Sequence, residues 1–340
     1  MRELWIPGIE EVDARRSVQE ELHERASAAA REVFGPRVFI RGVIEVSNFC
    51  RENCHYCGMR RSNRQIERYR AAFDSLAELV LQDLPASITD INIQAGEDPV
   101  AAREIVVPLV ELLSRSTTLG TSVCLGTLDI GLTRQLMTAG ASVYIIKFET
   151  ADPAIYTRLE APGSLGERLA HIQWLASEGW SVSSGFIAGL PGQDSKDAVA
   201  NLRLAASLPL GGCSVSPFIP GEATPLASSE GCELDLALNC MAALRLMRPG
   251  WVIPAVSALN IAGPGVGYRR GIRAGANLCT INLTPGSLRD EYLLYKRGRQ
   301  IMTEEAVLSA IDAEGLSPAP TRLSEHYART VFEPPSVKGA

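Results

Sequence analysis

Hydrophobic and polar positions along the chain form two alternating kinds of segment. Short apolar runs predict buried strands, at residues 42–47, 89–94, 120–125, 142–148, 181–187, 212–217, 252–257 and 277–282. Longer stretches with a helical pattern fill the gaps, at residues 71–83, 100–114, 131–139, 164–178, 195–206, 234–247 and 303–314. Strands that alternate with helices predict parallel strands joined by helical crossovers. Eight such units predict an α/β fold, a (β/α)8 barrel of the TIM type, with its chemistry at the C-terminal ends of the strands.

The two ends of the chain differ from this repeat. Residues 10–34 predict one amphipathic helix, which ends at Gly35 and Pro36. Residues after about 320, which include Glu333-Pro-Pro-Ser336, predict a loose tail. We therefore expect an N-terminal helical extension over residues 1–36, the barrel over residues 37–320 and a C-terminal tail over residues 321–340.

Composition and charge narrow the class of protein. The chain has 340 residues, of which 46% are hydrophobic and 21% are charged, and its net charge is −6. An acidic balance argues against a nucleic-acid partner, which would need a basic face. No apolar run approaches the roughly 20 residues of a membrane span, and the first residues contain no apolar signal core. Eight cysteines in a chain of this length indicate a reducing cytoplasm and not a disulfide framework.

Three of these cysteines are clustered. Cys50, Cys54 and Cys57 form a CxxxCxxC pattern directly after the first predicted strand. Three thiolates can hold three irons of a cubane cluster, so that the fourth iron keeps an open position. The alternatives are a zinc site, which usually has four ligands although only His55 is nearby, or three ordinary cysteines. The position of the pattern favours one 4Fe–4S cluster, and Tyr56 could pack beside a bound adenine.

Further motifs agree with this cluster. Gln94-Ala-Gly96-Glu97 follows the second predicted strand, and Gly185-Phe-Ile187-Ala-Gly189 lies at the fifth. With the cysteines, they resemble the radical S-adenosylmethionine (SAM) superfamily. The resemblance implies that the cluster binds SAM, and that a reduced flavodoxin or ferredoxin supplies the electron which produces a 5′-deoxyadenosyl radical. It also implies a set of SAM-binding residues: Tyr56, Gly96, Glu97, Glu149, Thr150, Arg168 and Ile187.

Within the superfamily, segments such as Phe148-Glu149-Thr150 and Gly189-Leu-Pro-Gly-Gln193 are similar to the FeFe-hydrogenase maturase HydE, and the ends of the chain are similar to methylornithine synthase. Two positions that hold lysine in methylornithine synthase correspond here to Ser214 and Ala258, neither of which is charged. The resemblance therefore implies a small polar substrate, such as an amino acid or a derivative of one. We expect it to contact Gln94, Ser214, Ser257, Arg289, Tyr292 and Tyr295.

The chain also departs from the maturase. A histidine that precedes the Glu-Thr pair there is Phe148 here, and no cysteine occurs in residues 296–340, so no second cluster is expected. Three functions remain open: a HydE-like enzyme that abstracts hydrogen from a small molecule, a methylornithine-synthase-like carbon-skeleton mutase, and a non-catalytic iron–sulfur sensor or carrier.

Overall fold

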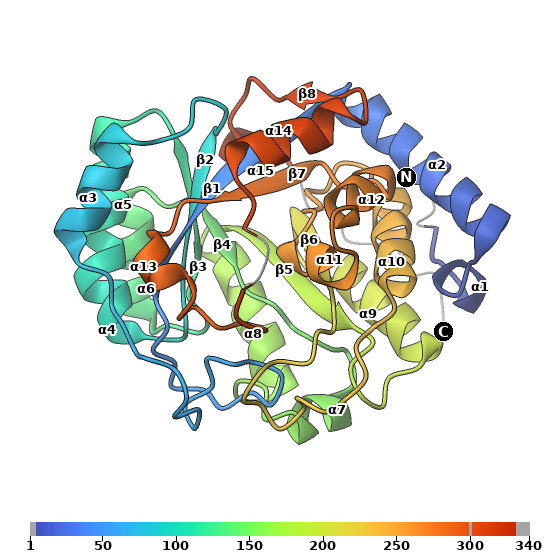
Figure 1. Cartoon of the computed structure of the whole chain (residues 1–340), viewed down its shortest axis with the longest axis horizontal. Coiled ribbons are helices and arrows are strands. Elements are labelled where there is room, and N and C mark those ends of the chain that lie inside the picture. Colours follow the sequence, from blue (N-terminus) through green and yellow to red (C-terminus); the bar gives the residue numbers. More distant parts are fainter. Residues whose placement is uncertain (1–4, 299–300, 331–340) are drawn as a thin grey trace.

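The computed structural model describes residues 5–298 and 301–330, which form an α/β barrel (Figure 1). Seven parallel strands pair in the order β6-β5-β4-β3-β2-β1-β7. Their bounds are Arg37–Ser47 (β1), Asp90–Ala95 (β2), Gly120–Cys124 (β3), Val143–Ile145 (β4), Ser181–Ala188 (β5), Gly212–Pro217 (β6) and Leu278–Asn282 (β7). A short strand, β8 (Ser317–Pro318), pairs with the start of β1. The parallel sheet predicted from the sequence is thus confirmed.

The predicted strand at 252–257 is only partly formed. Val252 makes an isolated bridge to β6 and Pro254 makes one to β7, so this segment closes the ring between the two strands. Pro254 has no N–H to donate, which prevents a continuous ladder. The chain then leaves the sheet, because Ser257 is already the first residue of helix α11 (Ser257–Ala262).

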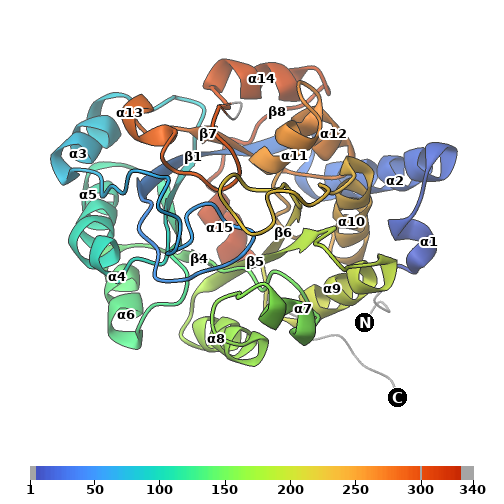
Figure 2. The same cartoon turned by 60° about the horizontal axis from the view of Figure 1, so that its bottom comes forward.

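Helices surround the sheet, as the crossovers of a parallel barrel require (Figures 1 and 2). Their bounds are Phe73–Gln82 (α3), Pro99–Ala101 (α4), Val107–Ser116 (α5), Ile130–Ala139 (α6), Pro153–Arg158 (α7), Leu165–Ser177 (α8), Ser195–Ser207 (α9), Leu234–Met247 (α10), Gly267–Arg273 (α12), Gly286–Arg289 (α13) and Glu304–Asp312 (α14), with a π-helical turn, η1 (Ala102–Val106), between α4 and α5. Aliphatic side chains of strands and helices form one large core. No helix of the described chain is long and apolar enough to cross a membrane.

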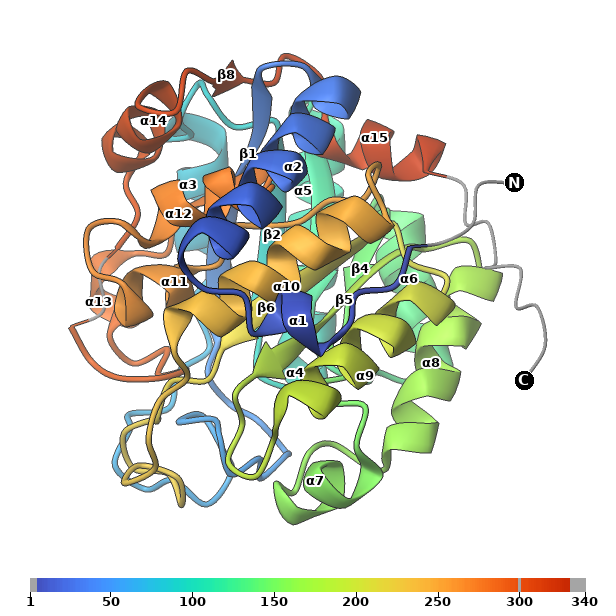
Figure 3. The same cartoon turned by 90° about the vertical axis from the view of Figure 1, so that its right-hand side faces the viewer.

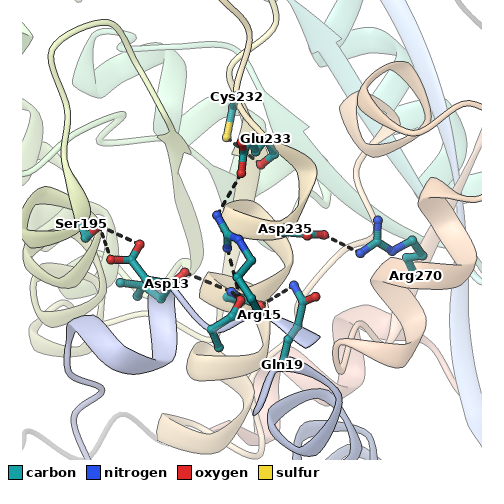
Figure 4. Close-up of polar contacts among 11 residues, drawn as sticks. Asp13, Arg15, Gln19, Ser195, Cys232, Glu233, Asp235 and Arg270 are labelled. Atoms are coloured by element: carbon teal, nitrogen blue, oxygen red, sulfur yellow. Dashed lines mark hydrogen bonds and ion pairs between the residues drawn. The ribbon is translucent and has the colours of Figure 1, made fainter. Parts of the chain in front are cut away.

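The N-terminal extension consists of two helices, α1 (Ile9–Val12) and α2 (Arg16–Phe34), and not of the single helix predicted over 10–34. It packs along α10 (Figure 3). The buried Asn239 of α10 donates to the carbonyl oxygens of Val12 and Ala14, both at 3.0 Å, and so binds the break between the helices. Surface contacts add to this attachment, among them the ion pair between Arg15 and Glu233 at 2.9 Å (Figure 4).

The C-terminal segment packs against the barrel where strands β2 and β3 begin. Helix α15 (Leu323–Arg329) packs under β3, and the Asp90 carboxylate accepts the N–H groups of Leu323 and Ser324 at 2.6 and 2.9 Å. Tyr327 is buried. The prediction of a loose tail is therefore wrong for residues 321–330, because a short helix with two buried side chains has little signal in the sequence. Residues 331–340 lie outside the described chain.

Candidate active site

A cavity of about 320 Å³ lies inside the barrel, between the cysteine loop and α15. Inward-facing residues of the strands line it, because side chains alternate between the two faces of each strand. Most of the predicted site residues lie on its wall: Cys50, Cys54, Tyr56, Cys57, Gln94, Gly96, Glu97, Glu149, Arg168, Ile187, Ser214, Ser257, Tyr292 and Tyr295. Thr150 and Arg289 do not line it.

The cysteine loop follows β1 and crosses the C-terminal end of the barrel (Figure 2). Arg68 holds its shape by donating to the carbonyl oxygens of Met59 and Arg60, at 2.9 and 2.7 Å. Gly96 lets the loop approach β2, since a Cβ atom there would lie 2.2 Å from the Phe49 carbonyl oxygen. The glycine predicted to face SAM thus has a clear role in seating the cysteine loop.

All three thiols of this loop are free and largely enclosed. Burial raises the pKa of each, and that of Cys57 to about 12. The Glu97 N–H donates to the Cys50 sulfur at 3.3 Å. Such thiols are poor free thiolates, so positive charge must be supplied next to them before they ionise.

Glu97 is already occupied by other residues. Its carboxylate accepts the Arg51 Nε–H at 2.8 Å and the Thr127 N–H at 2.9 Å, and Arg168 lies 3.9 Å away. The side chain is 6% exposed. The structure therefore shows Glu97 as the centre of an ion-pair network that ties the cysteine loop to the loop after β3.

Two further cations, which were not predicted from the sequence, line the cavity. Arg41 lies on the inner face of β1, and its Nε–H donates to Thr280 at 3.2 Å. Lys147 lines the cavity after β4 and has no hydrogen bond or ion pair with any described residue. Burial by itself would lower the pKa of Lys147, but the nearby Glu149 and Tyr295 outweigh this effect. The net result is a raised pKa, so the ammonium stays charged. Arg41 could have been predicted from the alternation of side chains along a strand, because it lies four residues before Glu45 and therefore on the same face of β1. The predicted strand, however, began only at residue 42.

Several hydroxyl groups also line the cavity. The Ser214 hydroxyl donates to the Ser184 carbonyl oxygen at 3.3 Å, whereas the Ser216 hydroxyl, which the sequence analysis missed, is buried without a partner in the described chain. Ser257, Tyr292 and Tyr295 also line the cavity, as expected.

Arg289 was predicted to anchor the substrate, and the structure does not place it there. Its guanidinium donates twice to the Thr284 carbonyl oxygen, at 3.1 and 2.7 Å, and so fixes the loop after β7. Thr150 is likewise behind the cavity wall, where its hydroxyl accepts the Gln193 side-chain amide at 3.1 Å. Thr150 and Arg289 therefore support residues or loops near the cavity and do not line it. The sequence motif alone does not show which of its residues line a cavity.

Comparisons with known proteins agree with this geometry. Residues 44–205 match the radical SAM superfamily. The chain is 32% identical over 280 residues to the FeFe hydrogenase maturase subunit HydE of Thermotoga maritima, which covers 82% of this chain and 80% of that protein. The chain belongs to the radical SAM superfamily. It is also 27% identical over 306 residues to 3-methylornithine synthase of Methanosarcina acetivorans, covering 88% and 86% of the two chains.

A solved structure of methylornithine synthase (PylB) has the same fold, with a TM-score of 0.81 and 23% identity, and covers 93% of this chain and 94% of that one. The (β/α)8 barrel is therefore confirmed. Radical SAM enzymes use a 4Fe–4S cluster and SAM, and this chain is an enzyme of the group that includes HydE, methylornithine synthase and biotin synthase.

The cavity of this radical SAM enzyme has unfilled polar positions that fit the cofactor. Glu149 Oε2 and Arg168 Nε are buried and have no hydrogen-bond partner among the described residues. Glu149 also has a positive φ of 63°, in the left-handed region that non-glycine residues seldom adopt. Burial raises the pKa of Glu149, although Lys147 and Arg168 oppose the shift. An amino acid moiety, with an ammonium and a carboxylate, would satisfy both orphaned atoms.

Proposed function

We propose that this chain binds one 4Fe–4S cluster through Cys50, Cys54 and Cys57, cleaves SAM there, and abstracts hydrogen from a small anionic substrate held by Arg41 and Lys147. The observation that carries the proposal is the polarity of the cavity. Its wall combines the three thiols, the two cations Arg41 and Lys147, and polar atoms that have no partner in the described chain.

The residues near the cysteines have separable roles in this proposal. Glu149 accepts the SAM ammonium, and Arg168 donates to its carboxylate in the geometry that suits a guanidinium. Tyr56 and Ile187 belong to one apolar cluster next to the cysteine loop and offer a surface for the adenine. Cys50, Cys54 and Cys57 would hold the 4Fe–4S cluster, which when bound and reduced would supply the electron for cleavage of the sulfonium bond. Its electron donor is a reduced flavodoxin or ferredoxin.

The polar groups of the cavity wall indicate the kind of substrate. Arg41 and Lys147 supply two positive charges, and the Ser214, Ser216 and Ser257 hydroxyls supply neutral hydrogen bonds. An anion in such an enclosed site needs charged or multiply hydrogen-bonding partners, and here they are present. A carboxylate or another compact anion therefore fits best. Ser214 and Ala258, which correspond to the two positions that hold lysine in methylornithine synthase, carry no charge here.

Anaerobic assay of the reconstituted enzyme tests this function. The enzyme with SAM and dithionite should form 5′-deoxyadenosine, and an anionic substrate should accelerate its formation. A cluster-loaded protein that binds SAM but never forms 5′-deoxyadenosine would act as a sensor or carrier. Conversion of lysine to methylornithine at an ordinary rate would support the mutase alternative.

A further inference from the structure

The glutamate that we assign to the SAM ammonium stands on a strained backbone. Glu149 has a φ of 63°, and the β-carbon makes this left-handed region costly for any residue other than glycine. Such a conformation persists only where the surrounding contacts enforce it. The contacts on either side of Glu149 therefore determine where its carboxylate lies.

Before the turn, the backbone of β5 supplies these contacts. The N–H groups of Phe148 and Glu149 both donate to the Gly185 carbonyl oxygen, at 3.0 and 3.1 Å. The Ile187 N–H in turn donates to the Glu149 carbonyl oxygen at 2.9 Å. These bonds fix the chain up to Glu149.

After the turn, two side chains supply the contacts. The Asn201 side chain on α9 accepts the Ala151 N–H through its carbonyl oxygen, Oδ1, at 2.6 Å. The Gln193 side-chain amide donates to the Thr150 hydroxyl oxygen at 3.1 Å. The two residues that follow Glu149 are thus held from the loop and the helix that follow β5.

Asn201 is the less expected of these two side chains. It is fully buried, and its Nδ2 has no hydrogen-bond partner among the described residues. The other buried side chains of α9 are all apolar: Ala198, Val199, Leu202, Ala205 and Ala206. A buried amide with an unsatisfied donor costs stability, which an apolar side chain at this position would avoid. The bond to Ala151 is the contact that accounts for an amide here.

We propose that Asn201 is a positioning residue for Glu149. By holding Ala151, it fixes the turn from which the Glu149 carboxylate enters the cavity, with Oε2 left unpaired for a ligand. This rests on the proposed function, because it assumes that Glu149 accepts the SAM ammonium. Asn201 itself does not line the cavity, so it would act on SAM only through Glu149.

A double-mutant cycle tests whether Asn201 acts through Glu149. Calorimetric titration of the cluster-loaded enzyme with SAM gives the dissociation constants of the unmodified protein, Asn201→Ala, Glu149→Gln and the double variant. Asn201→Ala should raise the dissociation constant about tenfold, within the range of coupling in a shared hydrogen-bond network. In the Glu149→Gln background the same substitution should change it by less than about twofold, because the carboxylate that it positions is gone. Equal weakening in both backgrounds, or in neither, would overturn the proposal.

Two further variants separate positioning from stability. Asn201→Asp keeps an oxygen that accepts the Ala151 N–H, and burial favours its uncharged form. Its dissociation constant for SAM should stay within about twofold of that of the unmodified enzyme; weakening equal to that of Asn201→Ala would exclude the hydrogen bond as the cause. Asn239→Ala is the matched control, because this equally buried asparagine of α10 holds the N-terminal extension. It should lower the melting temperature and leave the affinity for SAM unchanged.

Hydrogen exchange of the enzyme without SAM separates this inference from the proposed function. In Asn201→Ala, the backbone amides of residues 149–151 should exchange about tenfold faster or more, because the bond at Ala151 is lost, whereas Asn239→Ala should leave them unchanged. If Glu149→Gln does not weaken SAM binding, the proposed function is wrong for Glu149, and the exchange rates still show whether Asn201 holds the turn. If Glu149→Gln weakens SAM binding but Asn201→Ala changes neither exchange nor affinity, the proposed function stands and Asn201 has no positioning role.

Discussion

Replacing Glu149 with glutamine should separate binding from stability. In the absence of SAM, this carboxylate is enclosed, one of its oxygens has no partner in the described chain, and burial raises its pKa. A carboxyl group whose pKa is raised by folding costs free energy in its charged form. Glu149→Gln removes that cost and keeps the shape, so we expect the free energy of unfolding of the apo protein to stay the same or increase.

The affinity for SAM should change in the opposite direction. A hydrogen bond between charged groups contributes about 1.5–3 kcal/mol, which corresponds to about a 10- to 150-fold weaker affinity for SAM in the variant. Calorimetric titration of the cluster-loaded protein measures the affinity, and thermal unfolding of the apo protein measures the stability. Glu111→Gln is the control, because Glu111 is 46% exposed on α5 and should affect neither quantity.

One pattern of results would refute this reasoning. If Glu149→Gln destabilises the apo protein and leaves the affinity for SAM unchanged, Glu149 is a structural residue. Its positive φ would then be a feature of the loop after β4 and not of a binding site.

Further substitutions test the other parts of the site. Cys54→Ala should abolish cluster binding, while iron analysis of the unmodified enzyme should give about four irons per chain, and about eight would disprove a single cluster. Arg41→Met should weaken substrate binding about tenfold or more while SAM cleavage without substrate persists; loss of both activities would contradict its placement. Glu97→Gln should destabilise the apo protein by about 1–3 kcal/mol, because it disrupts a buried ion-pair network; an unchanged melting temperature would be inconsistent with that network. Burial lowers the pKa of His171 to about 4, from 6.5 in the unfolded chain. Between these two values the unfolded chain binds a proton that the folded chain does not. The free energy of unfolding should therefore be highest above about pH 6.5 and fall as the pH drops towards 4. His171→Gln should flatten that dependence in unfolding titrations, and an identical slope would exclude the assignment.

The barrel and the cysteine site could be predicted from local patterns. The spacing of apolar residues changes between strands and helices, so their alternation can be read from the sequence. The CxxxCxxC pattern after the first strand spans only eight residues and is recognised directly. The prediction of a full strand at residues 252–257 was wrong, because one proline interrupts its backbone hydrogen bonding. Pro254 lacks the N–H for a ladder, so the segment closes the barrel with isolated bridges only.

The cations of the cavity wall could not be predicted in the same way. Arg41 and Lys147 are 106 positions apart in sequence, and only the folded barrel brings both to the wall of one cavity. The motif placed Arg289 in the site, but the Thr284 carbonyl oxygen already takes its donors. Likewise, Glu97 matches the family pattern, yet Arg51 and the Thr127 N–H occupy its oxygens. Motifs fix which residues are near a site, and side-chain hydrogen bonds fix which of them remain available to a ligand.

Electron paramagnetic resonance of the reduced, reconstituted protein tests whether SAM binds at a 4Fe–4S cluster. We expect a signal from one cluster per chain, and a change in that signal when SAM is added, because we propose that SAM would bind to the cluster beside Glu149 and Arg168. The Glu149→Gln variant should show the same signal without SAM and need more SAM to change it. A cluster signal that SAM leaves unchanged at saturating concentration would contradict the account.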